Sequence, residues 1–389
     1  MIDNFLLAVR NINHKYIVVG RRKSNMLKIL HIFTNMNYVY TEALIELFYN
    51  YVQNCYHEFL ICDAKENVPK TIREKDEEQL RIHYLEDGNI RLEYREIKKY
   101  QKDFDYTIYH FLPNDILLHE YYKHHKKFLK NTIWRIWGAD LYNWEKKGIQ
   151  GFFFNAIRRK TRKEIPYVIA EPMDIPEYKK QFGEKTFLLG PDPKGYDVTF
   201  LNNHYESKKD NAVYILVGHS AVKTLHHKEI LTKLVGYKDR NIKIILPMNY
   251  GDMNYAKDVY NYAVSLFTQE KVIWIQEKMD LGEYVKLLWK CDIQIIHSER
   301  QIAMGNITMM MYMKKKIFLM QDSIMDEYYR KKEGLDIYNS SEIGNTSFEE
   351  FVKNIYSEKN RMFAIEEIDI NSIAKAWKET FEFLKSKRK

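Results

Sequence analysis

The chain is 389 residues long, which is more than one ordinary hydrophobic core organises and therefore predicts two domains. Hydrophobic residues make up 45% and charged residues 29%, a balance that is normal for a soluble globular protein. No apolar run reaches about 18 residues, which argues against a membrane-spanning helix. The cysteines Cys55, Cys62 and Cys291 form no CxxC pair, and we interpret them as reduced thiols in the cytoplasm.

The net charge of +8 points to an anionic partner such as nucleic acid, phospholipid headgroups or a phosphorylated substrate. A compositional explanation competes with this one, because abundant Lys, Ile, Asn and Tyr, with 30 Tyr, are typical of an AT-rich genome. Where the charge lies is therefore more informative than its total. No DNA- or RNA-binding motif accompanies the charge, so nucleic acid is not an expected partner.

Short apolar runs alternate with helical patterns along most of the chain. In the first half the expected strands are Leu27–Phe33, Glu58–Cys62, Tyr106–His110, Thr132–Trp137 and Tyr167–Ala170. In the second half they are Val213–Val217, Ile242–Leu246, Val272–Ile275, Ile293–Ile296 and Ile317–Met320, and helices are expected near Lys228–Leu234, Asn254–Leu266, Gly282–Lys290 and Ile307–Met313. Strands that alternate with helices predict βαβ units and a parallel sheet in each half.

The segment Gly190–Tyr196 reads GPDPKGY and is interpreted as the hinge, because its prolines and glycines favour a turn over a regular element. An amphipathic pattern over Ile373–Lys385 predicts a final helix. The expected organisation is an N-terminal extension over 1–25, domains over 26–195 and 196–372, and a C-terminal helix over 373–389.

Ligands of an open α/β domain bind at the carboxyl ends of its strands, and four loops of the second half carry suitable residues there. Arg300 and the helix start near Gly305 suit a diphosphate, because a guanidinium and free helix N–H groups both attract phosphate. An ordinary turn with a polar helix cap is the plainer explanation. The binding candidates in these loops are Gly218, His219, Ser220, Pro247, Met248, Glu277, Lys278, Arg300, Gln301, Gly305 and Asn306.

In the first half the distinctive string is WRIWGADLY, Trp134–Tyr142, which ends a strand and then presents Asp140 between aromatic residues. Aromatic rings stack on sugars, and a loop carboxylate accepts a hydroxyl proton as a general base. Core packing of the tryptophans and a helix cap at Asp140 are the alternatives. We take Asp140 as the candidate base, with His31 or His110 as the alternative, and Trp137, Gly138 and Tyr142 as substrate-facing residues.

Metal and cofactor signatures are weak. Asp103-Phe104-Asp105 matches a minimal DxD pattern, but it precedes an expected strand instead of following one, so it is interpreted as surface. The pairs His124-His125 and His226-His227 are adjacent in sequence and lack the i, i+4 spacing of a helical zinc site. No Walker A, GxSxG or GxGxxG string is present. Neither a metal nor a cofactor is expected.

Two stretches of the first half combine positive charge with aromatic residues. Tyr121–Lys130 reads YYKHHKKFLK, and Phe152-Phe153-Phe154 precedes a run of arginine and lysine. This pattern is typical of a helix lying in an anionic membrane interface, although a helix packed on the sheet with a solvated basic face would share it. We favour the membrane and expect these residues to face it: Tyr121, Tyr122, Lys126, Lys127, Phe152, Phe153, Arg158, Arg159 and Lys160.

Several strings in one order resemble a known family. WGADLY at Trp137–Tyr142, ILVGHS at Ile215–Ser220 and IILPMNY at Ile244–Tyr250, followed by LLWKCD and RQ with a later glycine, are similar to the TDP-N-acetylfucosamine:lipid II N-acetylfucosaminyltransferases, also called 4-alpha-L-fucosyltransferases, of enterobacterial common antigen synthesis. The similarity covers most of Val213–Lys316 and is patchy before that.

The resemblance implies a GT-B glycosyltransferase, an α/β protein with two facing Rossmann-like domains. The second domain would hold a TDP-sugar and the first would receive a polyprenyl-diphosphate-linked saccharide. An enzyme of this kind would work peripherally at the cytoplasmic face of the inner membrane, without an essential metal. Carried over to this chain, Gly218, Ser220, Glu277, Arg300, Gln301 and Gly305 would lie on the donor side, and Trp137, Gly138 and Asp140 would border the acceptor.

The chain departs from the family pattern at its donor loops. Ala221-Val222 stands where the family has a further glycine and an acidic residue, and the segment after RQ reads Ile302-Ala303-Met304-Gly305-Asn306. The donor sugar is therefore open. The alternatives are a GT-B enzyme with another nucleotide sugar and acceptor, a nucleotide-sugar epimerase, or a nucleotide- or anionic-lipid-binding protein without turnover.

Overall fold

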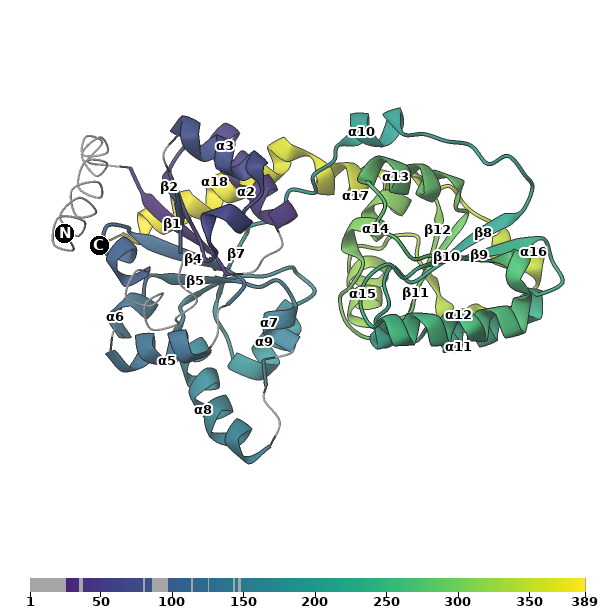
Figure 1. The fold of residues 1–389 in the computed structure, drawn as a ribbon, viewed down its shortest axis with the longest axis horizontal. Helices are drawn as coiled ribbons and strands as arrows, with labels where there is room; N and C mark the ends of the chain where they lie inside the picture. The colour runs from purple at the N-terminus through teal and green to yellow at the C-terminus, as the bar shows by residue number, and fades with distance from the viewer. Residues whose placement is uncertain are drawn as a thin grey trace, which may run out of the picture.

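The computed structural model describes residues 26–34, 38–79, 81–85, 97–112, 115–124, 126–142, 144–145 and 148–388. The described chain forms two lobes, each built on a parallel sheet with helices around it (Figure 1). The parallel sheet expected in each half is confirmed. The expected extension over 1–25 lies outside the described residues.

The first sheet has seven strands in the order β3-β2-β1-β4-β5-β6-β7. They are β1 (Lys28–Phe33), β2 (Tyr56–Ile61), β3 (Ile82–Tyr84), β4 (Tyr106–His110), β5 (Thr132–Arg135), β6 (Tyr167–Ile169) and β7 (Thr186–Leu188). The helices of this lobe are α2 (Tyr38–Asn50), α3 (Lys70–Gln79), α5 (Asp115–His124), α6 (Lys126–Leu129), α7 (Ala139–Tyr142), α8 (Ile149–Glu164) and α9 (Ile175–Phe182). The central strands are buried on both faces, which is why they read as nearly continuous apolar runs.

The second sheet has six strands in the order β10-β9-β8-β11-β12-β13. They are β8 (Val213–Val217), β9 (Ile242–Pro247), β10 (Val272–Ile275), β11 (Ile293–Ile296), β12 (Lys316–Leu319) and β13 (Tyr338–Asn339). Its helices are α10 (Val198–Asn203), α11 (His227–Leu234), α12 (Met253–Phe267), α13 (Leu281–Lys290), α14 (Met304–Tyr312), α15 (Ile324–Asp326), α16 (Phe348–Val352) and α17 (Glu358–Ile368). A last helix, α18 (Ile370–Ser386), follows α17.

Three strands that the sequence analysis did not predict, β3, β7 and β13, are all edge strands. An edge strand pairs on one side only and packs less surface, so it is short and lacks the apolar run of a central strand. The ten predicted strands correspond to strands of the structure, with ends shifted by at most two residues.

Each sheet reverses its strand order once, between β1 and β4 in the first and between β8 and β11 in the second. At such a point the loops after neighbouring strands diverge and leave a crevice where ligands of open α/β sheets bind. The loops that the sequence analysis selected follow β5, β8, β9, β10 and β11. The topology therefore places them at the carboxyl edges of the two sheets.

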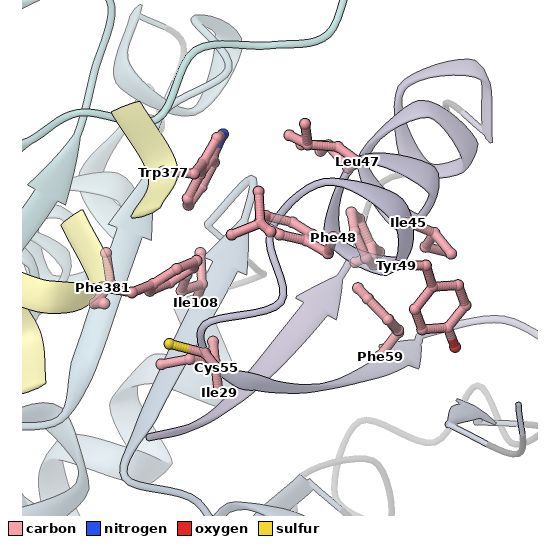
Figure 2. Packing of buried hydrophobic residues seen from close by; sticks show 14 of the residues in the cluster. Ile29, Ile45, Leu47, Phe48, Tyr49, Cys55, Phe59, Ile108, Trp377 and Phe381 are labelled. Atoms are coloured by element: carbon pink, nitrogen blue, oxygen red, sulfur yellow. The ribbon is translucent and has the colours of Figure 1, made fainter. Parts of the chain in front are cut away.

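The final helix α18 belongs to the core of the first lobe. Its side chains Trp377 and Phe381 are fully buried and pack with Phe48 of α2 and Ile29 of β1 (Figure 2). The chain therefore crosses between the lobes twice, once through the hinge after β7 and once between α17 and α18 (Figure 1).

The two crossings are tied together where α18 meets the hinge. Trp377 Nε1 donates to Pro191 O at 3.0 Å, and Thr380 Oγ1 donates to Leu189 O at 2.6 Å. A Cβ added at Gly190 would lie 2.9 Å from Trp377 Cζ2, so this position has no room for a side chain. Arg135 of β5 donates to Gly190 O through Nε at 3.3 Å and Nη2 at 3.2 Å.

We expect Trp377→Ala to destabilise the first lobe, because it removes a fully buried indole and its hydrogen bond to the hinge. Loss of a buried large aromatic side chain costs about 3–5 kcal/mol. Urea denaturation followed by circular dichroism should show a lower midpoint, whereas Glu379→Ala, an exposed neighbour on α18, should leave it within error. Equal midpoints for the two variants would contradict the packing described.

Candidate active site

A cavity of about 1000 Å³ lies between the two lobes, at the carboxyl ends of both sheets. Both lobes and the hinge contribute to its wall. The lining residues that matter below are Trp137, Gly138, Tyr142, Glu171 and Asp174 from the first lobe, Lys194 and Tyr196 from the hinge, and His219, Pro247, Lys278, Arg300, Gln301, Gly305 and Asn306 from the second.

The second-lobe wall is centred on the start of α14. This helix begins at Met304, three residues earlier than expected, so Gly305 and Asn306 lie in its first turn and line the cavity. The N–H groups of a first turn have no acceptor within the helix, and they form the positive end of its dipole. Arg300 lies half-buried in the same wall and adds a full positive charge. Helix start and guanidinium therefore face one space, as a diphosphate site requires.

Two hydrogen bonds hold this helix start in place. The Tyr196 hydroxyl of the hinge donates to Gly305 O at 3.1 Å, and Asn306 Nδ2 donates to Tyr284 Oη at 2.6 Å. The first bond links the hinge directly to the first turn of α14, which follows the loop that carries Arg300.

Gly218 and Ser220, expected to contact a ligand, lie behind the cavity wall and do not line it. Gly218 has φ +72°, and a Cβ there would lie 2.3 Å from His227 Nε2, so the glycine makes room for a buried histidine. Ser220 is fully buried and lies 3.3 Å from His219 Nε2 through its Oγ. Both residues shape the loop that presents His219 to the cavity.

Of the remaining second-lobe candidates, some line the cavity and others do not. Pro247 and Lys278 line the cavity, whereas Met248 is fully buried in the core beneath. Glu277 is exposed but does not line the cavity. His219 lines it, and burial, with a smaller contribution from Arg300, lowers the pKa of this histidine to about 4, so it is neutral at physiological pH.

On the first-lobe wall, Trp137, Gly138 and Tyr142 line the cavity, as expected for the WGADLY string. Gly138 has φ +86°, and a Cβ there would lie 4.0 Å from Gln301 Oε1. The two walls therefore approach each other closely at Gly138 and Gln301.

Asp140, the expected base, is buried and does not line the cavity. Its Oδ2 accepts from Leu112 N at 2.9 Å and from Trp134 Nε1 at 2.7 Å, and its Oδ1 accepts from Trp137 N at 3.0 Å. With these three donors around it, the carboxylate organises the loop that carries Trp137. Asp140 lies inside α7 and none of these three donors belongs to that helix, so the bonds are not those of a helix cap.

His31 and His110, the alternative bases, lie in a chain of buried histidines beneath α2 and do not line the cavity. His57 Nε2 donates to Val52 O at 3.0 Å, so its Nδ1 accepts from His31 Nε2 at 2.9 Å. His31 Nδ1 in turn accepts from His110 Nε2 at 2.9 Å. Burial lowers the pKa of all three histidines, which keeps them neutral.

Asp174 is a buried residue, 1% exposed, that lines the cavity and that the sequence analysis missed. It follows β6 at the start of α9, and its Oδ1 accepts from the Tyr142 hydroxyl at 2.7 Å. Burial raises the pKa of Asp174 to about 7, the Tyr142 hydrogen bond opposes the rise, and Glu171 adds to it. Its place after the predicted strand Tyr167–Ala170 was the available signal, because the carboxyl edge of a sheet is where ligands bind.

The DxD string lies far from the cavity. Asp105 accepts from Lys28 N at 2.9 Å and pairs with Arg388 at 3.1 Å, which places it at the beginning of β1 and β4, the edge opposite the cavity. Within the described part of the chain, no group of three or more His, Cys, Asp or Glu side chains is arranged to hold a metal ion.

The expectation that Tyr121 and Arg158 face a membrane is wrong. Tyr121 is 2% exposed and packs in the core between α5 and the sheet, and Arg158 is 6% exposed and donates to Trp144 O. Helical periodicity identifies residues that share a face, but it does not say which face meets the sheet. Arg162, on the same face as Arg158, likewise lies over the rings of Trp134 and Trp144.

Other residues of the expected membrane surface are exposed. Phe152 and Phe153, near the N-terminus of α8, are 75% and 68% exposed, and Ile149 beside them is 87% exposed. Lys126, Lys127, Arg159 and Lys160 are also exposed, and Tyr122 is half-buried beneath Lys160. Among the described helices, none has both the length and the apolar character needed to cross a bilayer.

Solved structures share this two-lobed architecture. A glycosyltransferase from Rickettsia africae is 14% identical with a TM-score of 0.63, over 92% of this chain and 99% of that one. Anabaena HepE, solved with UDP and glucose, is 12% identical with a TM-score of 0.64, over 92% and 100%. Sucrose-phosphate synthase from Thermosynechococcus elongatus is 7% identical with a TM-score of 0.62, over 92% and 100%. At these identities the likeness shows the fold, which is GT-B.

The sequence also matches a family model along most of its length. The model is described as 4-alpha-L-fucosyltransferase, glycosyl transferase group 56, and it matches residues 48–378, which run from the end of α2 through the second lobe into α18. With the cavity between the lobes and the GT-B fold in place, the chain is a glycosyltransferase and belongs to the 4-alpha-L-fucosyltransferase family.

Proposed function

We propose that the protein transfers a deoxy-amino sugar, of the N-acetylfucosamine type, from a TDP-sugar to a hydroxyl of a polyprenyl-diphosphate-linked oligosaccharide. The product would enter a bacterial surface polysaccharide such as enterobacterial common antigen. The observation that carries the proposal is the cavity itself, where the start of α14 and Arg300 face Trp137 and Tyr142. The family match and the nucleotide sugar bound to Anabaena HepE support the same reading.

The donor would bind with its diphosphate at the start of α14. Transfer breaks the bond between the anomeric carbon and the diphosphate, so negative charge grows on the departing nucleotide. The first-turn N–H groups of α14 are held in place by the bonds to Tyr196 and Tyr284, and together with Arg300 and Lys278 they would stabilise that charge. Fixed positive groups of this kind favour the transition state over the bound donor, as catalysis requires.

Another nucleotide sugar is the alternative donor. The family pattern is broken at Ala221-Val222, and Ala221 N in this structure donates to Tyr250 O at 2.8 Å, so this loop is held against the loop after β9. Both loops border His219, Pro247 and Tyr250 of the cavity wall. A donor panel that includes TDP- and UDP-sugars therefore tests the assignment.

The acceptor suggests that the enzyme works at the cytoplasmic face of the inner membrane. Helix α8 projects beyond the rest of the first lobe (Figure 1), and its N-terminal end exposes Ile149, Phe152 and Phe153. Contiguous exposed apolar side chains mark an interaction surface. The lysines of α6 and Lys160 lie along the C-terminal half of α8, where Lys126 pairs with Glu164, and would add positive charge that suits anionic headgroups.

We expect Arg300→Ala to weaken nucleotide binding and slow transfer. A charge-assisted hydrogen bond contributes about 1.5–3 kcal/mol, which corresponds to TDP affinity about 10- to 100-fold lower. Calorimetry with TDP and UDP measures the affinity, and transfer from TDP-sugars measures the rate. Arg240→Ala, which removes an exposed arginine paired with Glu349 outside the cavity, serves as the control. Unchanged affinity and rate in Arg300→Ala would show that the donor does not bind at this wall.

We expect the double variant Phe152→Ser/Phe153→Ser to lose membrane binding. Two exposed rings that enter a bilayer contribute about 1.5–3 kcal/mol each, so binding should fall by about 100-fold or more. Flotation with vesicles of phosphatidylglycerol and phosphatidylethanolamine measures the bound fraction. Neutralising Lys126, Lys127, Arg159 and Lys160 should weaken binding to these vesicles at low salt.

The matched control for this experiment is Tyr356→Ser, which removes another exposed ring, 68% exposed, from the second lobe. It should float like the unaltered protein. If the unaltered protein does not float, or if the double variant floats equally well, the proposed membrane surface is wrong.

A further inference from the structure

Transfer to a hydroxyl needs a group that accepts the hydroxyl proton, and the residues expected for this task lie elsewhere. Asp140 already accepts three hydrogen bonds, and His31 and His110 lie in the core. A proton acceptor must reach the cavity and have a free lone pair at the reacting atom. His219 lines the cavity on the donor wall, in the field of Arg300, and on the first lobe and hinge the cavity-lining side chains that can accept a proton are the carboxylates Glu171, Asp174 and Asp192.

Two of these three carboxylates already face a cation. Asp192 pairs with Arg135, and that pair also holds the hinge. Glu171 lies in the field of Lys194, whose ammonium it stabilises more than any other charged group does. Both carboxylates are therefore compensated by a neighbouring positive charge.

Asp174 differs from them in its contacts. Its Oδ1 accepts from Tyr142, and among the described residues no hydrogen bond reaches its Oδ2. The residue occupies the position that caps α9, yet its side chain makes no capping bond to that helix. A carboxylate at a helix start usually accepts from the first-turn N–H groups. Here the side chain is held by Tyr142 at the cavity wall.

Asp174 also lies opposite the donor wall. Burial and the Asp174 carboxylate raise the pKa of Tyr142, and Arg300 of the other lobe opposes that rise, so Arg300 is close enough for its charge to act at Tyr142. The approach of Gly138 to Gln301 shows the same proximity. An acceptor held by the first lobe would thus lie between Asp174 and the donor.

We infer that Asp174 is the general base of the transfer reaction and that Tyr142 is its positioning residue, an inference that rests on the proposed function. The acceptor hydroxyl gives its proton to Oδ2 of Asp174, and its oxygen forms the new bond to the anomeric carbon. The bond from that carbon to the diphosphate breaks, and the electron pair leaves with the nucleoside diphosphate at Arg300. Base and leaving group occupy opposite walls, so the anomeric configuration is inverted.

The groups around Asp174 determine the pH at which it can act. Tyr142 and Asp140 face it from α7, Glu171 from its own loop, and Glu177 and Arg300 act on the neighbouring Tyr142. Burial raises the pKa of Asp174 to about 7. A general base works in its deprotonated form, so kcat/KM of the unaltered enzyme should fall as the pH falls through about 7.

The first test is Asp174→Asn, in which the amide oxygen still accepts from Tyr142 but cannot take a proton. The assay uses TDP-N-acetylfucosamine, TDP-glucose and UDP-glucose as donors and a farnesyl-diphosphate-linked disaccharide as acceptor. We expect kcat to fall about 10²- to 10⁴-fold while TDP affinity, measured by calorimetry, stays unchanged. Glu184→Gln, an exposed carboxylate just beyond α9, is the matched control and should keep its kcat.

The second test is Tyr142→Phe, which removes the hydrogen bond that lowers the pKa of Asp174. The acidic limb of kcat/KM should therefore move to higher pH, a change that a purely structural role of Tyr142 would not produce. If Asp174→Asn is misfolded and fails to bind TDP, the pH shift in Tyr142→Phe still tests whether Asp174 is the general base. NMR of the product should show inversion.

The outcomes separate the inference from the proposed function. If the unaltered enzyme transfers no sugar from any of the three donors, the proposed function fails, and the inference fails with it. If it does transfer and Asp174→Asn keeps its kcat and pH profile, the function stands and the base is elsewhere. An unmoved acidic limb in Tyr142→Phe, or a product with retained configuration, would also overturn the inference.

Discussion

The packing of Trp377 against Gly190 is the constraint on which the arrangement of the two lobes depends. The indole lies where a side chain on residue 190 would have to go, and its N–H holds the carbonyl of Pro191. This contact joins the two places where the chain passes between lobes. Arg135 completes the joint, because it binds the carbonyl of Gly190 and reaches the carboxylate of Asp192 from the sheet. The hinge that borders the cavity is therefore anchored to the first lobe at Gly190, Pro191 and Asp192.

The hinge also contacts the second-lobe wall of the cavity. Tyr196 donates to the carbonyl of Gly305, so a residue of the crossing holds the helix whose start faces the cavity. The start of α14 is thereby held in place, and preorganised N–H groups of this kind stabilise developing charge without a cost of reorientation. The same geometry would keep water from the anomeric carbon once both substrates are bound.

Several residues beside the cavity do not line it, but they contact and position the residues that do. Gly218 makes room for His227, Ser220 lies against His219, and Asp140 gathers the N–H groups that orient Trp137. Each is a small or polar residue in the segment that follows a strand, which is also where ligand contacts of such sheets are found. These three residues differ from ligand-contacting residues in what lies beside them. A buried histidine or a backbone amide occupies the space where a ligand would otherwise bind.

The amino-acid sequence by itself determined the alternation of strands and helices, the hinge at Gly190–Tyr196 and the loops that meet at the cavity. These are local properties, because apolar runs, prolines and glycines act on their own segment of chain. It also selected Trp137, Tyr142, Arg300 and Gln301, which do line the cavity.

Only the tertiary structure decided which side of each element faces the cavity, the core or the solvent. Arg158 and Arg159 are neighbours in a basic run, yet one is buried against Trp144 and the other is exposed, because packing of α8 on the sheet selects the face. Asp174 and Asp140 are both aspartates near helix starts, and only their neighbours distinguish them. Three N–H donors enclose Asp140, whereas one hydroxyl holds Asp174 at the cavity. These contacts join residues distant in sequence, and no local pattern encodes them.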